Sequence, residues 1–536
     1  MKAIRKILVA IVIMAIGFII GSAVIISLWR RNLSNPQVIS YSSNAGKVGV
    51  LISSMRNKYV DEINVDSIID LALPQILKEL DPHSAYYPAE ETKESNDELH
   101  GSFSGIGVQF TIQEDTVRVN SVIHGGPSEK VGVLAGDRII TINDSVFAGK
   151  KIASNEIVKN LKGPSGTEVR IGVMREGESD LLEFTIERAP IPVKSVDAAY
   201  IIPKTDNVGY MLINKFGETT YTEMLTGLAK LSSQGMKSLV IDLRGNTGGY
   251  LVAAIRMVNE FLPKGDLIVY TEGIHSPRSS QYADGRGQFK NIPLVVLIDE
   301  SSASASEIFT GAIQDNDRGT IVGRRSYGKG LVQEPIVFAD GSSIRLTIAR
   351  YYTPSGRCIQ KPYGESEEDY AMDIVKRYEH GEFFSADSVK QDESLLFKTK
   401  GGREVYGGGG IMPDHFVPQD TTGYSKYYET VIRKSLVNKF SFRYVDRNRS
   451  RLAEFTSSSD MASYLDRTGV LEQFYDYAAE NGVKRDHTLS AAARRQMRHA
   501  LLSNIIYDAM EMDDYIQFFN VGDPTLDKAV EVLKQK

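Results

Sequence analysis

An uninterrupted apolar run sets the first 31 residues apart from the rest of the chain. No charged residue occurs from Ile7 to Trp29, and a helix of this length, about 34 Å, is long enough to cross a bilayer. More basic residues precede the run than follow it, which favours a cytoplasmic N-terminus and an exported remainder. We therefore expect residues 1–31 to be a single-pass anchor in the inner or plasma membrane. A cleavable signal peptide, cut near Gly21–Ala23, is the alternative.

The next residues change pattern twice. A polar linker rich in Ser and Asn covers residues 32–43, and apolar positions at helical spacing then predict a small helical cap over residues 44–102. From 103 to 188 the pattern becomes five short β-type runs separated by glycine turns, with two short helices near 128–132 and 154–161. This pattern predicts a small β domain.

Strands alternate with helices between residues 189 and 423, which predicts an α/β core. Within it, residues 364–393 are acidic and poor in large aliphatic side chains, so we expect a solvated insertion or flap. Residues 424–536 have a charged helical pattern, with helical stretches over 461–480 and 488–512. The fold class expected for the chain is therefore multidomain α/β with an N-terminal membrane helix and a helical C-terminal extension.

Composition narrows the choice of function. The 536 residues carry a net charge of −6, and five of the basic residues lie in the first 31 positions. Nucleic acid is therefore not an expected partner, because phosphate binding requires a basic surface. Cys358 is the only cysteine, which excludes an intrachain disulfide and any zinc site built from cysteines.

Two segments carry candidate chemistry. Ser304 lies where a predicted strand gives way to a helix, a position that exposes its hydroxyl near the positive end of the helix dipole. The ordinary use of serine at this position is as an N-cap. Lys329 stands between two glycines, and it could act as a general base if burial lowered its pKa from about 10.4 toward 7–8. Gln333 lies on the same face of the following strand and could orient the amine; a surface lysine in a glycine hairpin is the plainer interpretation.

A third segment, DLRGNTGG at residues 242–249, follows a strand and precedes a helix. Its glycine amides form a natural site for an anion.

The segment GRRSYGKG at 323–330 offers two competing interpretations. It nearly matches a phosphate-binding loop, although Gly330 replaces the required hydroxyl. Ser326 and Lys329 also spell the S-x-x-K pattern of acyl-transfer enzymes, but Gly328 disfavours the helix which that pattern needs.

Taken together, six motifs resemble the tail-specific, or C-terminal processing, serine proteases. They are LDPHSAYY, GIGVQF, DLRGNTGG, SASASEI, YGKGLVQ and GGGGIMPD, which occur in the order of that family, and the resemblance covers residues 44–420. The resemblance implies Ser304 as nucleophile, Lys329 as general base and Gln333 as its partner. It further implies an oxyanion hole formed by the N–H of Ala305 and that of Gly248 or Gly249.

The same resemblance identifies residues 103–188 as a PDZ domain. In such a domain the backbone N–H groups of Gly105, Ile106, Gly107 and Val108 would hold the terminal carboxylate of a peptide that adds a strand to the sheet. Residues 189–423 would then be the protease core. His83, within the DPHS sequence, is expected to be structural, because Asp-Pro-His favours a turn.

The resulting hypothesis is an exported, membrane-anchored endopeptidase that captures free protein C-termini and cleaves upstream of them. The chemistry needs no metal or organic cofactor. Two alternatives are a catalytically silent peptide-binding scaffold and an acyl-transfer enzyme that uses Ser326. The sequence leaves open whether the chain forms a homo-oligomer or binds an accessory adaptor, and the role of residues 424–536 is either assembly or packing.

Overall fold

The computed structural model describes residues 44–113, 115–175, 177–364 and 366–535, and it divides at Glu79 into two compact units. The first unit contains helices α2 (Asn44–Lys58) and α3 (Val65–Lys78). The side chain of Asn64 caps α3 by accepting a hydrogen bond from the N–H of Ser67 at 3.1 Å. The expected membrane span and the linker over 32–43 lie outside the described residues. Across the ranges given above, no helix combines the length and the apolar character needed to span a bilayer.

The expected helical cap over 44–102 is only partly correct. Helix α4 (Ala89–His100) is present, but Ala85–Tyr87 forms strand β1 and both elements belong to the second unit. Strand β1 pairs antiparallel with β18 (Ser343–Tyr352). A pairing across more than 250 positions leaves no local signal in the pattern of apolar residues.

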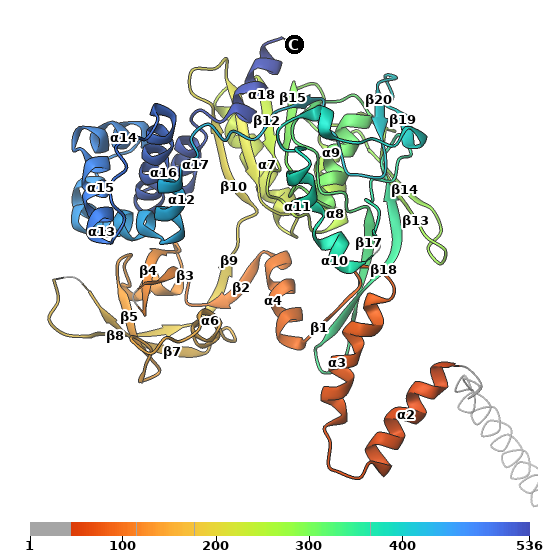
Figure 1. Cartoon of the computed structure of the whole chain (residues 1–536), viewed down its shortest axis with the longest axis horizontal. Helices are drawn as coiled ribbons and strands as arrows, with labels where there is room; N and C mark the ends of the chain where they lie inside the picture. The colour runs from red at the N-terminus through yellow and green to blue at the C-terminus, as the bar shows by residue number, and fades with distance from the viewer. Residues whose placement is uncertain (1–43, 114, 176, 365, 536) are drawn as a thin grey trace, which may run out of the picture. The chain divides into compact units, whose positions relative to one another are not determined.

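The expected β domain is present and antiparallel (Figure 1). Its sheet has the strand order β3-β4-β5-β7-β8, with β6 beside β5, so that β3 is an edge strand. Alternate side chains such as Val119, Ile139 and Val173 are completely buried between this sheet and the two short helices. The elements are β3 (Val108–Gln113), β4 (Thr116–Val122), α5 (Pro127–Val131), β5 (Arg138–Ile142), β6 (Ser145–Val146), α6 (Ser154–Leu161), β7 (Glu168–Met174) and β8 (Leu182–Glu187), and the domain is entered and left through the paired strands β2 (Ser102–Gly105) and β9 (Ala189–Pro192).

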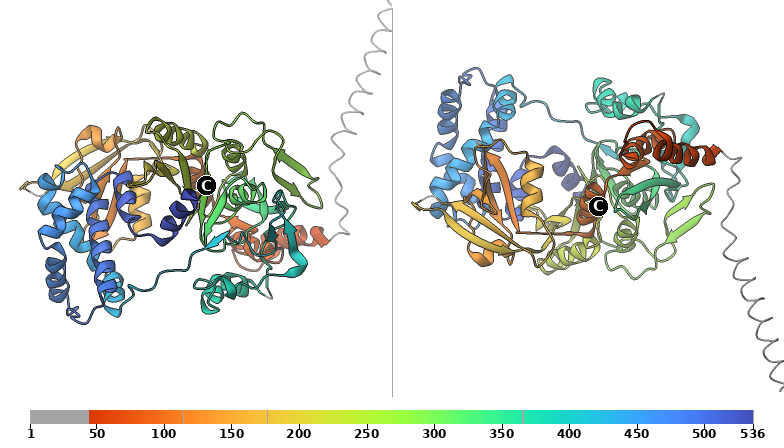
Figure 2. Two further views of the ribbon diagram at one scale, coloured as in Figure 1. Left: turned by 90° about the horizontal axis from the view of Figure 1, so that it is seen from above. Right: turned by 90° about the horizontal axis from the view of Figure 1, so that it is seen from below.

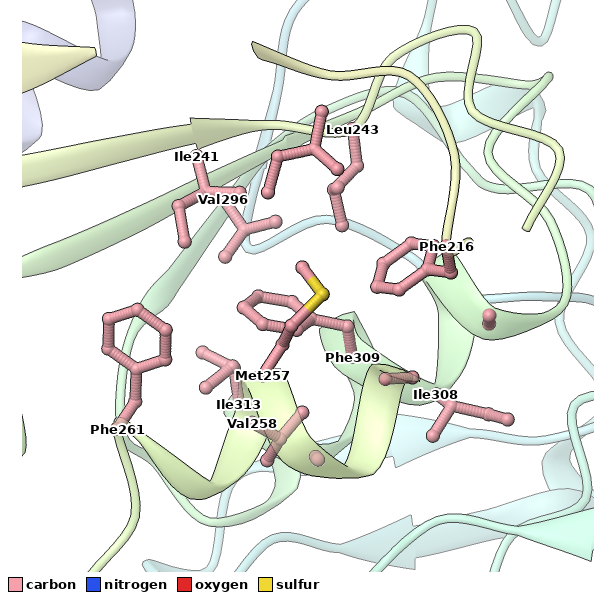
Figure 3. Packing of buried hydrophobic residues seen from close by; sticks show 14 of the residues in the cluster. Phe216, Ile241, Leu243, Met257, Val258, Phe261, Val296, Ile308, Phe309 and Ile313 are labelled. Carbon is pink, nitrogen blue, oxygen red and sulfur yellow. The ribbon is translucent and has the colours of Figure 1, made fainter. Parts of the chain in front are cut away.

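The α/β core is built on a six-stranded sheet of order β10-β11-β12-β15-β16-β21, in which only β10 is antiparallel to its neighbour. Both faces are covered, because Leu239 and Ile241 pack with one cluster and Val240 with another. Figure 3 shows the first cluster, in which Met257 and Phe309 meet Ile241 and Val296. The elements are β10 (Val196–Ile201), β11 (Val208–Ile213), α7 (Thr220–Ser233), β12 (Ser238–Asp242), α8 (Leu251–Asn259), β15 (Leu294–Ile298), α9 (Ala305–Asp315), β16 (Thr320–Gly323) and β21 (His415–Phe416).

A second sheet carries β17 (Leu331–Val337), which begins two residues after Lys329. Strand β17 pairs with β18, and β18 also pairs with β1 and with β13 (Leu267–Glu272), which continues to β14 (Ser279–Tyr282). The two sheets are joined by the loop that contains Lys329. This arrangement brings the end of β15, the start of α9 and the start of β17 into one region.

The solvated insertion expected over 364–393 is present, because Tyr370, Arg377 and Phe383 are the only buried residues among those described in this range. This segment forms α10 (Glu367–Ala371), α11 (Asp373–Glu379) and two short 3₁₀ turns (Ala386–Ser388 and Glu393–Leu395), and strands β19 (Leu396–Lys398) and β20 (Glu404–Tyr406) follow it. The guanidinium of Arg377 is buried and donates to the carbonyls of Arg325 (2.7 Å) and Ser326 (3.0 Å). These hydrogen bonds attach the segment to the core, so it does not depend on many large aliphatic side chains for its attachment.

The C-terminal helices form their own hydrophobic core, in which Met461, Phe474, Leu501 and Ile505 are completely buried. The helical stretch expected over 461–480 is divided by Gly469, which has a left-handed φ of +66°. The helices are α12 (Lys426–Arg433), α13 (Leu436–Leu452), α14 (Ser458–Arg467), α15 (Val470–Glu480), α16 (Ala491–Ala509), α17 (Met512–Phe519) and α18 (Pro524–Lys534). Helix α18 packs on the α/β sheet, whereas α13 contacts the β domain through the ion pair of Asp446 with Arg118. In both views of Figure 2 the blue C-terminal helices lie beside the orange strands of the β domain.

Candidate active site

Ser304 immediately precedes α9 and has a backbone φ of +56°, which is unusual for a residue other than glycine. With a ψ of −113° it lies in a sparsely populated region, which costs about 1–3 kcal/mol and persists where the surroundings enforce it. Here the 242–249 loop holds the turn, since the N–H of Ala303 (3.0 Å) and the hydroxyl of Ser306 (2.8 Å) both donate to the carbonyl of Asn246. The strained serine is therefore fixed by two loops that are more than 50 residues apart in sequence.

The amine of Lys329 donates a hydrogen bond to Oε1 of Gln333 at 3.0 Å, so the contact expected from the sequence is present. The Gln333 amide is held in turn, because its Nε2 donates to the carbonyl of His83 at 2.6 Å. Burial lowers the pKa of Lys329, and the nearby charge of Arg345 lowers it further, while Glu307 and Asp81 act in the opposite direction. The net effect is a lowered pKa of Lys329, which makes the neutral amine, the form that can accept a proton, more available.

Glu307 links the serine turn to the lysine loop, and the sequence interpretation missed it. One carboxylate oxygen accepts the N–H of Ser304 (2.9 Å) and the N–H of Lys329 (2.8 Å). The other oxygen accepts the hydroxyl of Ser326 (2.5 Å) and the N–H of Gly328 (2.7 Å). The side chain is completely buried, and burial raises its pKa. The S-x-x-E spacing from Ser304, a capping-box pattern, is the signal that could have identified it.

A buried tyrosine adds a second link between the same two segments. The hydroxyl of Tyr351, on β18, donates to the carbonyl of Lys329 at 2.6 Å and lies 3.1 Å from the carbonyl of Ser304. Nothing in the local sequence pattern distinguished this tyrosine from its neighbour Tyr352. Glu307 and Tyr351 together fix the main chain of Ser304 relative to that of Lys329.

Ser326 is not placed as a nucleophile. It is 1% exposed, its hydroxyl donates to Glu307, and the same oxygen accepts the N–H of Ile411 at 2.6 Å. The segment that follows Lys329 is strand β17 rather than a helix. Both competing interpretations of residues 323–330 need a helix at this point, so neither fits the structure.

The two glycines of the 242–249 loop differ in their hydrogen bonding. The N–H of Gly248 donates to Oδ1 of Asn246 at 2.8 Å, whereas the N–H of Gly249 has no acceptor among the described residues. The same holds for the N–H of Ala305, the first residue of α9. Gly248 (φ +105°) packs so closely that a Cβ there would lie 2.8 Å from the Cβ of Ser304 and 2.9 Å from the nitrogen of Ala305. The glycine loop and the serine turn are therefore in direct contact.

His83 has the structural role expected for it. Its backbone N–H donates to Oδ1 of Asp81 at 2.8 Å, and its ring Nε2 lies 2.6 Å from the hydroxyl of Tyr370. Burial, followed by the positive charge of Lys329, lowers the pKa of His83 to about 4. The residue acts on the site through its carbonyl, which positions Gln333.

The candidate peptide-binding loop lies at the start of the edge strand β3. Ile106 is buried, and its carbonyl accepts the N–H of Ser128 at 3.0 Å. Gly107 has a left-handed φ of +75° and its carbonyl accepts the N–H of Ile123, so the loop from Gly105 to Val108 is held from both sides. A cavity of about 870 Å³ runs along β3, with Ser154 and Val158 of α6 also in its wall. An edge strand beside a cavity can accept a further strand.

In the described part of the chain, no group of three or more His, Cys, Asp or Glu side chains is arranged to hold a metal ion. The polar groups of the site instead hold one another and the main chain.

Comparison with known proteins assigns most of the chain to three family models. Residues 207–371 match "Peptidase family S41" and residues 104–186 match "PDZ domain". Residues 427–511 match a family of unknown function, DUF8443.

Among individual relatives, the chain is 34% identical to the "Carboxy-terminal-processing protease" of Bartonella bacilliformis over 76% of this chain and 92% of the relative. It is 32% identical to the "Probable CtpA-like serine protease" of Staphylococcus epidermidis over 66% of this chain and 70% of the relative. A solved structure of the photosystem II D1 C-terminal processing protease aligns at 27% identity, with a TM-score of 0.33, over 58% of this chain and 83% of that chain.

Proposed function

Because this chain belongs to the carboxy-terminal-processing proteases of peptidase family S41, we propose that its serine-type peptidase activity is carried by Ser304 as nucleophile and Lys329 as general base. The observation that carries this assignment is the Glu307 carboxylate, which binds the main-chain N–H groups of both residues. A buried glutamate shared in this way fixes the main chain of two residues that are 25 positions apart in sequence. The chain is a serine protease that recognises protein C-termini through its PDZ domain, and we propose that the Ser304–Lys329 dyad carries out the cleavage.

In the proposed reaction, the neutral amine of Lys329 takes the proton of the Ser304 hydroxyl as the oxygen bonds to the scissile carbonyl carbon. The protonated amine then gives that proton to the leaving nitrogen, the C–N bond breaks, and an acyl-enzyme remains. Water repeats the sequence, with Lys329 as base again, and releases the new C-terminus. Gln333 keeps the amine aligned without adding a negative charge that would hold it protonated.

We assign the oxyanion hole to the N–H groups of Ala305 and Gly249. Both are without an acceptor among the described residues, whereas the N–H of Gly248 is occupied by Asn246. The dipole of α9 adds to this site, because Ala305 is the first residue of the helix. Gly248 is then not a donor, and its lack of a side chain is what lets the glycine loop pack against the serine turn.

We assign capture of the substrate's terminal carboxylate to the N–H groups of the loop from Gly105 to Val108. The support is its place at the start of an edge strand beside an open cavity. We also propose that the apolar run from Ile7 to Trp29 anchors the protein in the inner or plasma membrane and leaves the protease exported, on the sequence grounds given above. The intact mass of protein extracted from membranes tests whether this segment is retained.

The test of function is cleavage of an unfolded protein with an apolar free C-terminus. We expect Ser304→Ala and Lys329→Met each to lower kcat/KM by at least about 1,000-fold, as removal of catalytic groups does in other serine proteases. Matched controls are Ser301→Ala and Lys264→Met, which leave the proposed dyad intact. Activity that survives both active-site substitutions contradicts the dyad. Wild-type protein that binds the tail but never cleaves it favours the silent scaffold instead.

A further inference from the structure

The cavity along β3 has a second wall that belongs to a different domain. One side is formed by Val108–Ile112 of β3 with Ser154 and Val158 of α6, which are the two elements that flank a peptide in a PDZ domain. The opposite side comes from the C-terminal helices α13, α16 and α17. We call this side the roof, and its residues are Ser435, Asn438, Lys439, Phe442, Asn504, Tyr507, Asp508 and Tyr515.

The roof is held in place by a buried polar contact. Arg118, on β4, is 6% exposed and forms an ion pair with Asp446 of α13 at 2.6 Å. Its guanidinium also stacks on the ring of Phe442, with 3.2 Å from the Cζ atom to the ring centroid. Such desolvated contacts fix orientation, because separating them would leave a buried charge without its partner. The helices are therefore docked on the β domain in a defined register.

Docking leaves the space beside β3 open. Within its sheet β3 pairs only with β4, so its outer backbone groups face the cavity and can pair with an incoming strand. A volume of about 870 Å³ lies within the range of sites that enclose a ligand. Had the helices served only to block the sheet edge, their side chains would fill this volume.

The chemistry of the roof suits an extended peptide. Tyr507 and Tyr515 stack edge to face with their ring centroids 5.0 Å apart, and Tyr507 is 41% exposed. Aromatic rings of this kind bury large apolar side chains. Asn438 and Asn504 add amide groups, which can hydrogen-bond the outer edge of a strand whose inner edge is paired with β3.

We propose that the C-terminal helical domain completes the peptide-binding site, so that the free carboxyl-terminal segment of an unfolded substrate lies as an added strand between β3 and the roof. This inference rests on the proposed function, because it takes the loop from Gly105 to Val108 as the site of the terminal carboxylate. It gives a role to residues 427–511, the region that matches a family of unknown function. Helices α13, α16 and α17 then contact the side chains near the C-terminus of the substrate, as the PDZ domain does.

Photo-crosslinking tests the proposal directly on the full chain carrying Ser304→Ala, which keeps the probe intact. The probe is a short apolar peptide with a free C-terminus and a benzoylphenylalanine two residues before its last residue. We expect peptide mapping to find crosslinks within residues 435–442 or 504–515 of the roof. Crosslinks confined to residues 105–161 would overturn the proposal, while leaving capture by the PDZ domain intact.

Binding measurements separate this proposal from the proposed function. Tyr507→Ala should weaken binding of the free-acid peptide by about 3- to 10-fold, the effect of losing one aromatic contact. The matched control is Tyr424→Ala, because Tyr424 is 64% exposed and does not line the cavity. Equal dissociation constants for Tyr507→Ala and the parent would contradict the proposal that the roof contacts the bound peptide. Equal binding of the amidated and free-acid peptides by the parent would contradict carboxylate capture itself, and the roof proposal with it.

Discussion

The amine of Lys329 donates to the amide oxygen of Gln333, a neutral acceptor, at 3.0 Å. An amide orients the amine without the charge that would favour its protonated form. Exchanging this amide for a carboxylate would keep the size of the side chain and change only the charge and one donor. The pair therefore offers a direct test of how a charge beside Lys329 changes its pKa.

Gln333→Glu is expected to raise the pKa of Lys329, because a negative charge beside the amine stabilises its protonated form. The base would then become available only at higher pH, so the alkaline-rising limb of kcat/KM should move to higher pH and the rate at neutral pH should fall. The matched control is Gln281→Glu, at an exposed position on β14. A pH profile identical to that of the wild type would exclude Gln333 as the neutral partner.

Arg345→Gln removes a cation that lowers the pKa of Lys329. Without this repulsion the pKa of Lys329 rises, and the pH profile of kcat/KM should shift toward higher pH. Arg350→Gln, at an exposed position on the same strand, serves as control, because its charge is not among those acting on Lys329. A shift to lower pH would show that the charge balance at Lys329 has been misassigned.

Glu307→Gln replaces two acceptor lone-pair sites with donors that face other N–H groups. We expect the free energy of unfolding to fall by about 1–3 kcal/mol, the cost of unpaired buried polar groups. The rate should fall as well, and its pH profile should move to lower pH, because the Glu307 charge raises the pKa of Lys329. Denaturant unfolding and kcat/KM measured against pH check both effects, with Glu272→Gln as an exposed control. Unchanged stability would show that the four hydrogen bonds of Glu307 are not formed in solution.

Gly248→Ala places a Cβ within 3 Å of Ala303, Ser304 and Ala305, at a φ of +105° that disfavours any side chain. The serine turn must then move, so we expect kcat/KM to fall by at least about 100-fold, the effect of losing an oxyanion donor. Gly245→Ala, in the same loop, is the control: its φ is +72° but nothing lies within 4 Å of the added carbon. It should cost about 1 kcal/mol of stability and retain cleavage. Similar losses of activity in both variants would show that the strain of the loop backbone, and not a clash with the serine turn, lowers kcat/KM.

The sequence predicted those parts of the site that follow local rules. Alternating β-type runs located the β domain. The local patterns only made Ser304 and Lys329 candidates, and the resemblance of six motifs to a protease family is what implied their roles as the proposed dyad. The contact of Gln333 with Lys329 spans four residues and was predicted from that local spacing, although Lys329 itself precedes β17.

Features that depend on distant contacts could not be predicted in this way. Glu307 was overlooked because its partners at 326, 328 and 329 reach it only through the fold. Residues 364–393 are poor in large aliphatic side chains, yet Arg377 anchors them through main-chain carbonyls. The pattern of apolar residues likewise does not predict that β1 pairs with β18. Nor does it predict that α13 docks on the β domain through Arg118.

The protonation of Lys329 is the most direct test of the proposed mechanism. In the Ser304→Ala protein, trace acetylation of lysine amines over a range of pH, followed by peptide mapping, gives a titration midpoint for each lysine. We predict a midpoint for Lys329 below those of the exposed lysines measured in the same digest. A midpoint equal to theirs or higher would contradict its role as the general base of Ser304.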